Sequence, residues 1–141
     1  MEMALQKQEQ ILCKALHTDL GKSKTESVMC EIGLVQGEIR WMKQHLGRLC
    51  RTKHVRTPLA QFAAKSYRSP SPYGNVLIMS PWNYPVLLTL EPLVDAIAAG
   101  NTAVVKPSAY APASANVLKD LLEEWIVKDS VCRKDMKSLV L

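Results

Sequence analysis

The sequence predicts an α/β protein, because its two halves follow different patterns. Residues 1–47 carry apolar residues at helical spacing, whereas two short apolar runs, 76–79 and 102–105, alternate with helical segments further along the chain. Over twenty residues separate the starts of the two runs, which is enough for a helix and the right-handed crossover that joins parallel strands. We therefore expect an amino-terminal helical hairpin followed by two βα units of a parallel sheet.

The amino-terminal half predicts two amphipathic helices. Gly21 ends the first helix, and Ser23-Lys24-Thr25-Glu26 has the pattern of a capping box that begins the second. Gly47 is the expected end of the second helix. The first helix places four leucines on roughly one face, Leu5, Leu12, Leu16 and Leu20. The second has a regular apolar stripe made of Val28, Ile32, Val35, Ile39, Met42 and Leu46.

The carboxyl half alternates strands and helices after a turn-rich boundary at residues 69–74. The first apolar run is expected to form a strand that is covered on both faces. A helix should follow over 85–99, where Pro92 must either begin the regular helix or kink it. After the second strand, residues 113–127 should form a helix. Its inward residues are Val117, Leu118, Leu121, Leu122 and Trp125.

The composition suits one folded domain. The chain has 141 residues, of which 48% are hydrophobic and 22% are charged, so it can bury a core and is not of disordered type. The net charge of +5 is typical of a soluble surface rich in lysine, although an acidic partner or an anionic cofactor would also suit it. Basic residues between Arg40 and Arg56 spread over a helix end and a loop without a nucleic-acid-binding motif. We predict no nucleic-acid partner.

The cysteines predict reduced thiols and no metal site. No two of them have the C-x-x-C spacing of a zinc or redox site, and no signal peptide precedes them, which favours a cytoplasmic protein. The most apolar stretch, 85–100, is interrupted by Glu91 and Asp95 and is too short to span a bilayer, so we predict no membrane partner. The four cysteines are Cys13, Cys30, Cys50 and Cys132.

Two loops are candidates for a ligand site. A parallel sheet binds ligands beyond the carboxyl ends of its strands, and the segments Ser80–Asn83 and Lys106–Ala109 follow the two predicted strands. The chain contains no GxGxxG or P-loop motif, so neither loop is the usual phosphate-binding turn.

The chain resembles the aldehyde dehydrogenase superfamily in two segments, YGNVLIMSPWNYP and LVDAIAAGNTAVVKPS, and in the distance between them. It resembles the shorter, class-3-like branch in TPLAQFAAKSYRSPSPYG and in LGKSKTESVMCEIGLVQGEI. The resemblance covers about residues 10–127. It implies a partial aldehyde dehydrogenase fold with four segments: an amino-terminal helical region at 1–54, a β-hairpin or arm with a linker at 55–73, a partial NAD(P)-binding Rossmann-like domain at 74–127, and an unmatched tail at 128–141.

The resemblance implies that Asn83 is a catalytic residue. Family members attack an aldehyde with a cysteine thiolate, and the asparagine of the aromatic-Asn-aromatic-Pro loop donates to the resulting oxyanion. A neutral amide suits this role, since it offers two N–H donors and does not titrate. The stiff neighbours Pro81, Trp82, Tyr84 and Pro85 then serve as support that holds the amide in place.

The resemblance also implies a site for NAD or NADP. In the family, the lysine at the end of the second strand reaches the adenosine ribose, and Lys106 occupies that position. The expected cofactor-binding residues are Met79, Ser80, Pro81, Trp82, Lys106, Ser108 and Ala109. The residues expected to face the aldehyde tunnel are Tyr84, Leu87 and Leu88.

This chain departs from the family pattern in two ways. The usual Lys-Pro-Ser-Glu is Lys-Pro-Ser-Ala here, and Ala109 would neither accept ribose hydroxyls nor repel a 2′-phosphate. The family's catalytic cysteine and general-base glutamate belong to a region downstream of residue 127, and none of the four cysteines has a nucleophile's context. We therefore expect a fragment of the enzyme that is inactive alone.

Three functions are consistent with these patterns. The first is a fragment of an NAD(P)-dependent aldehyde dehydrogenase, which oxidises an aldehyde to a carboxylic acid through a cysteine thiohemiacetal and forms a homodimer at full length. The second is a non-catalytic interaction module that docks on a full-length aldehyde dehydrogenase through its helices and arm. The third is a basic nucleic-acid binder. The mass of the purified chain and an aldehyde-dependent NADH assay would separate the first two functions from any unexpected activity.

Overall fold

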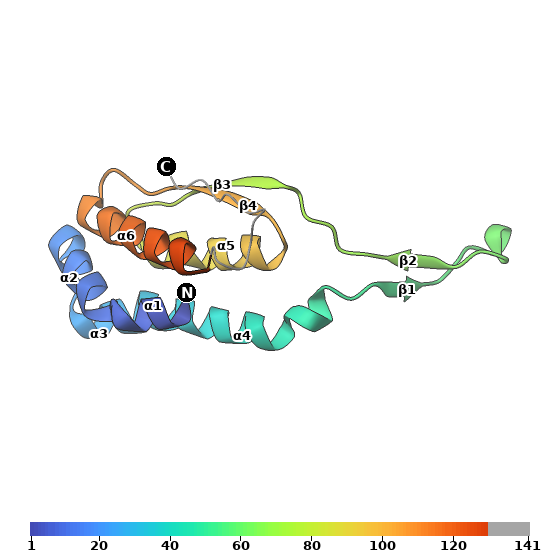
Figure 1. The fold of residues 1–141 in the computed structure, drawn as a ribbon, viewed down its shortest axis with the longest axis horizontal. Coiled ribbons are helices and arrows are strands. Elements are labelled where there is room, and N and C mark those ends of the chain that lie inside the picture. Colours follow the sequence, from blue (N-terminus) through green and yellow to red (C-terminus); the bar gives the residue numbers. More distant parts are fainter. Residues whose placement is uncertain (130–141) are drawn as a thin grey trace.

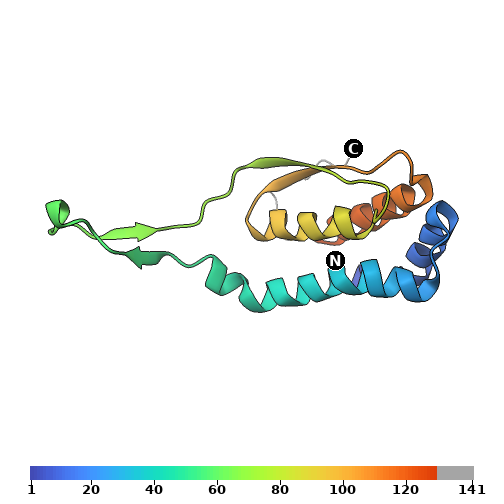
Figure 2. The same ribbon diagram turned by 180° about the vertical axis from the view of Figure 1, so that it is seen from behind.

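The structure, a computed structural model, describes residues 1–129 and has three layers and a projecting arm (Figure 1). A two-stranded sheet lies above a pair of helices, and the amino-terminal helices lie below that pair. The same order of layers is seen from behind in Figure 2. This is the α/β architecture that the sequence predicts.

Four helices make the amino-terminal layer: α1 (Glu2–Lys7), α2 (Glu9–Leu20), α3 (Lys24–Ser27) and α4 (Gly33–Leu49). Gly21 ends α2 in the left-handed conformation at φ 68°, and its N–H donates to the carbonyl oxygen of His17 over 2.9 Å. The Ser23 hydroxyl accepts from the backbone N–H of Glu26 at 3.2 Å, so the serine half of the predicted capping box forms.

The second predicted helix differs from expectation in two respects. A π-helical turn (Val28–Ile32) separates α3 from α4, and a Cβ atom at Gly33 would lie only 2.8 Å from the carbonyl oxygen of Val28. Glycine therefore allows the wider turn. The expected end at Gly47 was wrong, because α4 continues to Leu49; one glycine inside a helix costs only about 1 kcal/mol.

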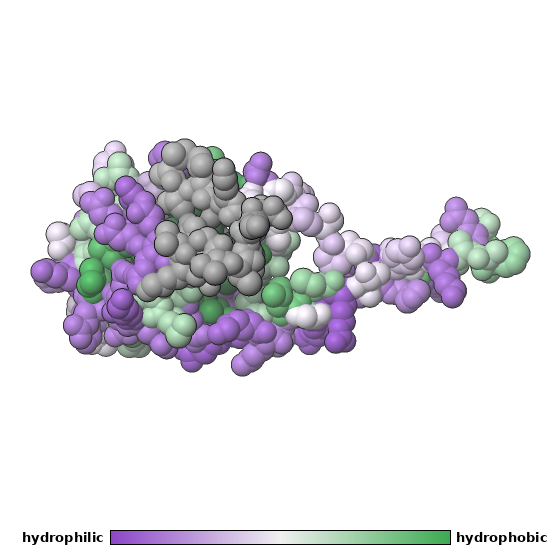
Figure 3. Space-filling view, in the orientation of Figure 1, coloured by the Kyte–Doolittle hydropathy of each residue, from purple (hydrophilic) through white to green (hydrophobic). Residues whose placement is uncertain are grey.

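An antiparallel arm leaves the body of the molecule after α4. Its strands are β1 (Lys53–Val55) and β2 (Ser66–Arg68), so the predicted hairpin forms and begins slightly before residue 55. A short 3-10 turn (Leu59–Gln61) lies at its tip. Figure 3 shows apolar residues among polar ones at the tip. Leu59 and Phe62 of this segment are 89% and 86% exposed.

The sheet consists of the parallel strands β3 (Asn75–Met79) and β4 (Thr102–Lys106). The helix between them is α5 (Leu87–Ala98), and α6 (Pro112–Asp129) follows β4. Pro92 lies inside α5 and does not begin it. Residues 130–141, with Cys132 and most of the predicted tail, lie outside the described part of the chain.

Among residues 1–129, no helix or strand covers one face of the sheet, contrary to the expectation that the first strand is covered on both faces. Ile78, Ala103 and Val105 are buried toward the helices, whereas Leu77 is 60% and Met79 is 68% exposed. The reason is topological: α5 and α6 both lie on the same side of the sheet (Figures 1 and 2).

The core joins this sheet to the amino-terminal helices. Most of its fully buried leucines come from the expected faces of the first predicted helix, which is divided into α1 and α2, and of α6. The remaining buried side chains come from the π-helical turn, α4, α5, the strands and the loop that precedes α5. The largest fully buried apolar side chains are Leu5, Leu12, Leu16, Ile32, Val35, Val86, Leu90, Val105, Leu118, Leu121 and Leu122.

Two carboxyl groups face each other between α4 and α5. Partial burial raises the pKa of Glu38 and of Asp95, and the negative charge of Asp95 further raises that of Glu38. A carboxyl whose pKa is raised on folding binds more protons in the native state. The contribution of such a carboxyl to the free energy of unfolding is therefore complete below its pKa in the unfolded state. This contribution is lost as the pH rises through its pKa in the folded state.

We accordingly expect Asp95→Asn to raise the melting temperature at pH 7 by about 2–5 °C, because exposed like-charge pairs cost about 1 kcal/mol or less. The gain should shrink toward zero as the pH falls below about 4, where both carboxyls are protonated in either state. Thermal melts across this pH range measure it. Asp120→Asn removes the same charge from an exposed position on α6 and should show no such pH-dependent gain.

Candidate functional site

The two candidate loops meet at one edge of the sheet. The strands pair in parallel with Met79 opposite Lys106, so both carboxyl ends lie side by side. The pairing continues into the loops, since the backbone N–H of Ser80 donates to the carbonyl oxygen of Lys106 at 3.2 Å. The segments Ser80–Asn83 and Lys106–Ala109 therefore form a single candidate site.

The Ser80–Pro85 loop is anchored at both ends and open in the middle. Ser80 and Pro85 are buried, and the Thr89 hydroxyl of α5 lies 2.7 Å from the Ser80 hydroxyl and 2.5 Å from the carbonyl oxygen of Pro85. Between these anchors Trp82 is 54% exposed, and Asn83 is exposed as well. Within residues 1–129, no side chain or backbone group bonds the Asn83 side-chain amide, which is left available to a ligand.

A buried ion pair from the amino-terminal helices contacts this loop. The ammonium of Lys22 lies 2.6 Å from Glu31 Oε1 and donates to the carbonyl oxygen of Asn83 at 2.8 Å. The other carboxylate oxygen of Glu31 accepts from the N–H groups of Val86 and Leu87, at 2.8 and 3.2 Å. Glu31 thus caps the start of α5, where a negative charge is favourable.

A second carboxylate caps α6 in the same manner. Asp19, near the end of α2, accepts from the N–H groups of Ala113 at 3.1 Å and Ser114 at 2.7 Å. The N-termini of both helices that follow the strands are thus occupied by acidic side chains of this chain. Neither terminus is free to bind a phosphate, in agreement with the lack of a glycine-rich phosphate motif.

Asp19, Lys22 and Glu31 were not predicted from the sequence as residues of the site. Their positions in the sequence look like ordinary polar residues of helix ends and faces. Only their contacts across the fold, with residues 55 to 95 positions away, reveal what they hold.

The residues expected to bind the cofactor lie along the bare face and edge of the sheet. Met79 and Lys106 are register partners, so both side chains project from the same face, and both are exposed. Pro81 and Ala109 are exposed and Ser108 is half-buried, with its hydroxyl accepting from the backbone N–H of Tyr110 at 3.2 Å. These residues offer an apolar surface next to an ammonium, which suits a dinucleotide.

The residues expected to face an aldehyde follow Asn83 in the chain. Tyr84 is 37% exposed, and its ring lies 3.9 Å from the Lys22 ammonium. Leu87 and Leu88 are half-buried and are the first two residues of α5.

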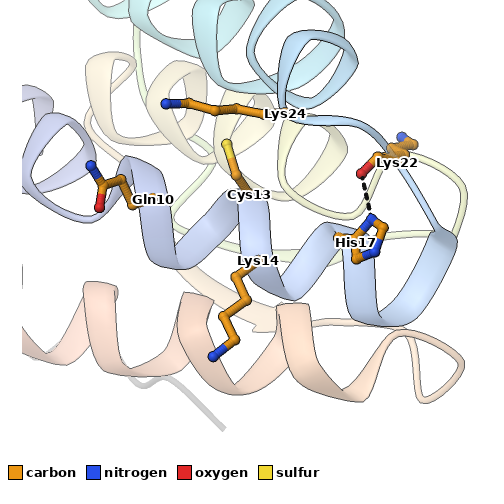
Figure 4. Close-up of a pocket in the computed structure, with 6 residues that line it drawn as sticks. All are labelled: Gln10, Cys13, Lys14, His17, Lys22 and Lys24. Carbon is orange, nitrogen blue, oxygen red and sulfur yellow. Dashed lines mark hydrogen bonds between the residues drawn. The ribbon is translucent and has the colours of Figure 1, made fainter.

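A surface pocket on α2 shares Lys22 with this site (Figure 4). His17 in it lies within hydrogen-bonding distance of the carbonyl oxygen of Lys22, at 3.1 Å. Burial, with a smaller effect of Glu9, raises the pKa of the Cys13 thiol, so this cysteine is not activated as a nucleophile. The lining residues are Gln10, Cys13, Lys14, His17, Lys22 and Lys24.

Comparison with known proteins identifies the family. A sequence profile described as Aldehyde dehydrogenase family matches residues 1–133, which extends beyond both ends of the resemblance at 10–127. The chain belongs to the aldehyde dehydrogenase family. The predicted family and the predicted partial aldehyde dehydrogenase fold are thereby confirmed.

Curated aldehyde dehydrogenases match this chain over most of its length. It is 46% identical over 124 residues to 4,4′-diaponeurosporen-aldehyde dehydrogenase of Staphylococcus aureus, covering 88% of this chain and 27% of that enzyme. It is 38% identical over 125 residues to aldehyde dehydrogenase family 3 member A2 of Rattus norvegicus, covering 89% and 26%. The chain thus spans about a quarter of the length of these aldehyde dehydrogenases.

Solved structures of aldehyde dehydrogenases share the fold. A substrate-bound Staphylococcus aureus AldH superposes with a TM-score of 0.85 at 46% identity, covering 87% of this chain and 27% of that one. The Methanocaldococcus jannaschii glyceraldehyde-3-phosphate dehydrogenase GapN, in complex with NADP, superposes at 0.76 with 22% identity, covering 92% and 27%. Within the described residues of this aldehyde dehydrogenase chain, no helix is both long and apolar enough to cross a membrane.

Proposed function

We propose that this chain forms the oxyanion-donor loop and half of the cofactor site of an NAD(P)-dependent aldehyde dehydrogenase. The complete enzyme would oxidise an aldehyde to a carboxylic acid. One observation carries the proposal: the exposed Asn83 amide has no partner among residues 1–129, while the backbone that bears it is held by buried contacts. An unpaired donor on a backbone that is held in place suits the stabilisation of a developing negative charge.

In this proposal the chain's own residues bind and orient. Asn83 donates an N–H to the oxyanion of the tetrahedral intermediate, Lys106 holds the adenosine ribose, and Met79 and Trp82 line the cofactor surface. NAD(P), when bound, accepts the hydride. In the family pattern the cysteine nucleophile and the general-base glutamate belong to a region downstream of residue 127, and within this chain the buried Cys13 is not activated.

The test is a chimera in which this chain's residues replace the aligned 124-residue segment of the Staphylococcus aureus enzyme. The substrates are straight-chain aldehydes and the aldehyde for which that enzyme is named. We expect the folded chimera to reduce NAD or NADP in the presence of aldehyde. A folded chimera that binds the cofactor but shows no turnover, beside an active parent, would overturn the proposal.

Cofactor choice depends on Ala109 in this proposal. A carboxylate beside the adenosine ribose would repel a 2′-phosphate, whereas alanine leaves the Lys106 ammonium unopposed. We expect Ala109→Glu in the chimera to lower the ratio of kcat/KM for NADP to that for NAD about tenfold, since about 1.4 kcal/mol corresponds to one decade. Both ratios are measured at one ionic strength. A ratio unchanged within about twofold would show that position 109 does not set cofactor choice.

The arm suits a contact between subunits. Its tip exposes Leu59 and Phe62, which are costly to leave in water unless another surface covers them (Figure 3). By the same proposal the complete enzyme is a homodimer, and size-exclusion chromatography with light scattering on the chimera measures its mass.

A further inference from the structure

The geometry points to a positioning role for Lys22 and Glu31: together they hold the carbonyl group of Asn83 and the backbone that follows it, and so help to aim the Asn83 amide. This inference rests on the proposed function, because it concerns the residue that we assign to the oxyanion. Neither Lys22 nor Glu31 reaches the reacting atoms in this scheme; both act through Asn83.

The pair contacts the loop before and after the point where it enters α5. Lys22 bonds the Asn83 carbonyl oxygen at 2.8 Å and lies 3.9 Å from the centre of the Tyr84 ring. Glu31 accepts from the N–H groups of Val86 and Leu87. Four of the five consecutive residues 83–87 are therefore in contact with one ion pair.

Burial makes these contacts rigid. Glu31 is 0% and Lys22 is 8% exposed, so neither side chain is free to exchange its partners for water. A buried ion pair is weak evidence for stability, because apolar residues of similar volume often stabilise as well or better. An orienting function explains why the Lys22 ammonium and the Glu31 carboxylate both form hydrogen bonds to the loop, with both oxygens of Glu31 paired.

The local backbone places Glu31 for this task. It lies in the π-helical turn (Val28–Ile32), the wide turn that Gly33 permits, and π-turns inside helices occur frequently at functional sites. The Asn83 carbonyl carbon is bonded to the Cα atom that bears the side chain, so fixing this carbonyl fixes the direction in which the Cα–Cβ bond leaves the backbone and limits where the amide can reach. A displacement of 1 Å at such a position can cost about 100-fold in rate.

The first test uses the 141-residue chain labelled with [15N]asparagine. Four asparagines report separately: Asn75, Asn83, Asn101 and Asn116. In Lys22→Met/Glu31→Gln, which leaves no unpaired charge and keeps an oxygen for the Val86 N–H, we expect shifted and more mobile Asn83 backbone and side-chain signals. The other three should keep their positions, which shows that the fold is intact. The matched control is Lys43→Met, which removes a lysine from an exposed pair with Glu2.

The second test measures turnover in the chimera described above. The double variant should lose about 10–100-fold in kcat with little change in aldehyde KM, whereas Lys43→Met should match the parent. When Asn83→Ala is added to the double variant, kcat should fall much less than when Asn83→Ala is made in the parent chimera. In the double variant the amide is already misdirected and no longer contributes to catalysis.

The outcomes separate this inference from the proposed function. If the double variant keeps the wild-type Asn83 signals, or keeps kcat within about twofold, the positioning role is wrong even though the chimera is active. If the parent chimera is inactive, the proposed function fails, and the Asn83 signals alone then decide whether the pair holds the loop. A variant that loses all four native asparagine signals would show that the pair holds the whole fold and would overturn a role specific to the loop.

Discussion

The Asn83→Ala variant of the chimera is expected to lose about 100–1,000-fold in kcat, the usual cost of removing one preorganised oxyanion donor. The loss should appear in kcat and in kcat/KM to a similar degree, because the proposed hydrogen bond forms with the intermediate and not with the bound aldehyde. Steady-state kinetics with saturating cofactor measures it.

A matched control is Asn116→Ala, which removes the same side chain from an exposed position on α6. It should leave kcat within about twofold. If Asn83→Ala instead raised KM and left kcat unchanged, the amide would bind the substrate uniformly and would not be the oxyanion donor.

The purified 141-residue chain is expected to produce no NADH or NADPH from any aldehyde. A lone oxyanion donor cannot replace a nucleophile, and the buried Cys13 has a raised pKa that keeps its thiol protonated. Cofactor absorbance with the chain in large excess measures this, with the parent staphylococcal enzyme as the positive control. Turnover that disappears in Cys132→Ala would contradict the prediction and identify a nucleophile in this chain.

Local signals in the sequence were sufficient for most of the elements. The leucines of the first helix, Gly21 at its end and the strand boundaries depend on periodicity and on the conformations that single residues allow. The parallel strands also followed from the sequence, because a connection of that length has few other solutions. The two candidate loops could then be placed at one edge without any coordinates.

The helical segment at residues 24–49 shows what local signals in the sequence do not predict. The apolar stripe from Val28 to Leu46 predicted one regular helix, but Gly33 lets the backbone widen into a π-turn. The stripe also does not report what it packs against, and Leu46 is 37% exposed where α4 extends toward the arm. Helix periodicity specifies which side chains share a face, and not whether a partner covers them.

The sequence by itself determined the family, the order of helices and strands and the residue, Asn83, that the loop presents. Only the tertiary structure decided what holds that residue. Lys22 and Glu31 lie 61 and 55 positions from the loop atoms that they bind, and Asp19 lies 94 and 95 positions from the N–H groups of α6 that it caps. Hydrogen bonds and ion pairs act between atoms that folding brings together, so their partners have no signature in the local pattern of one chain.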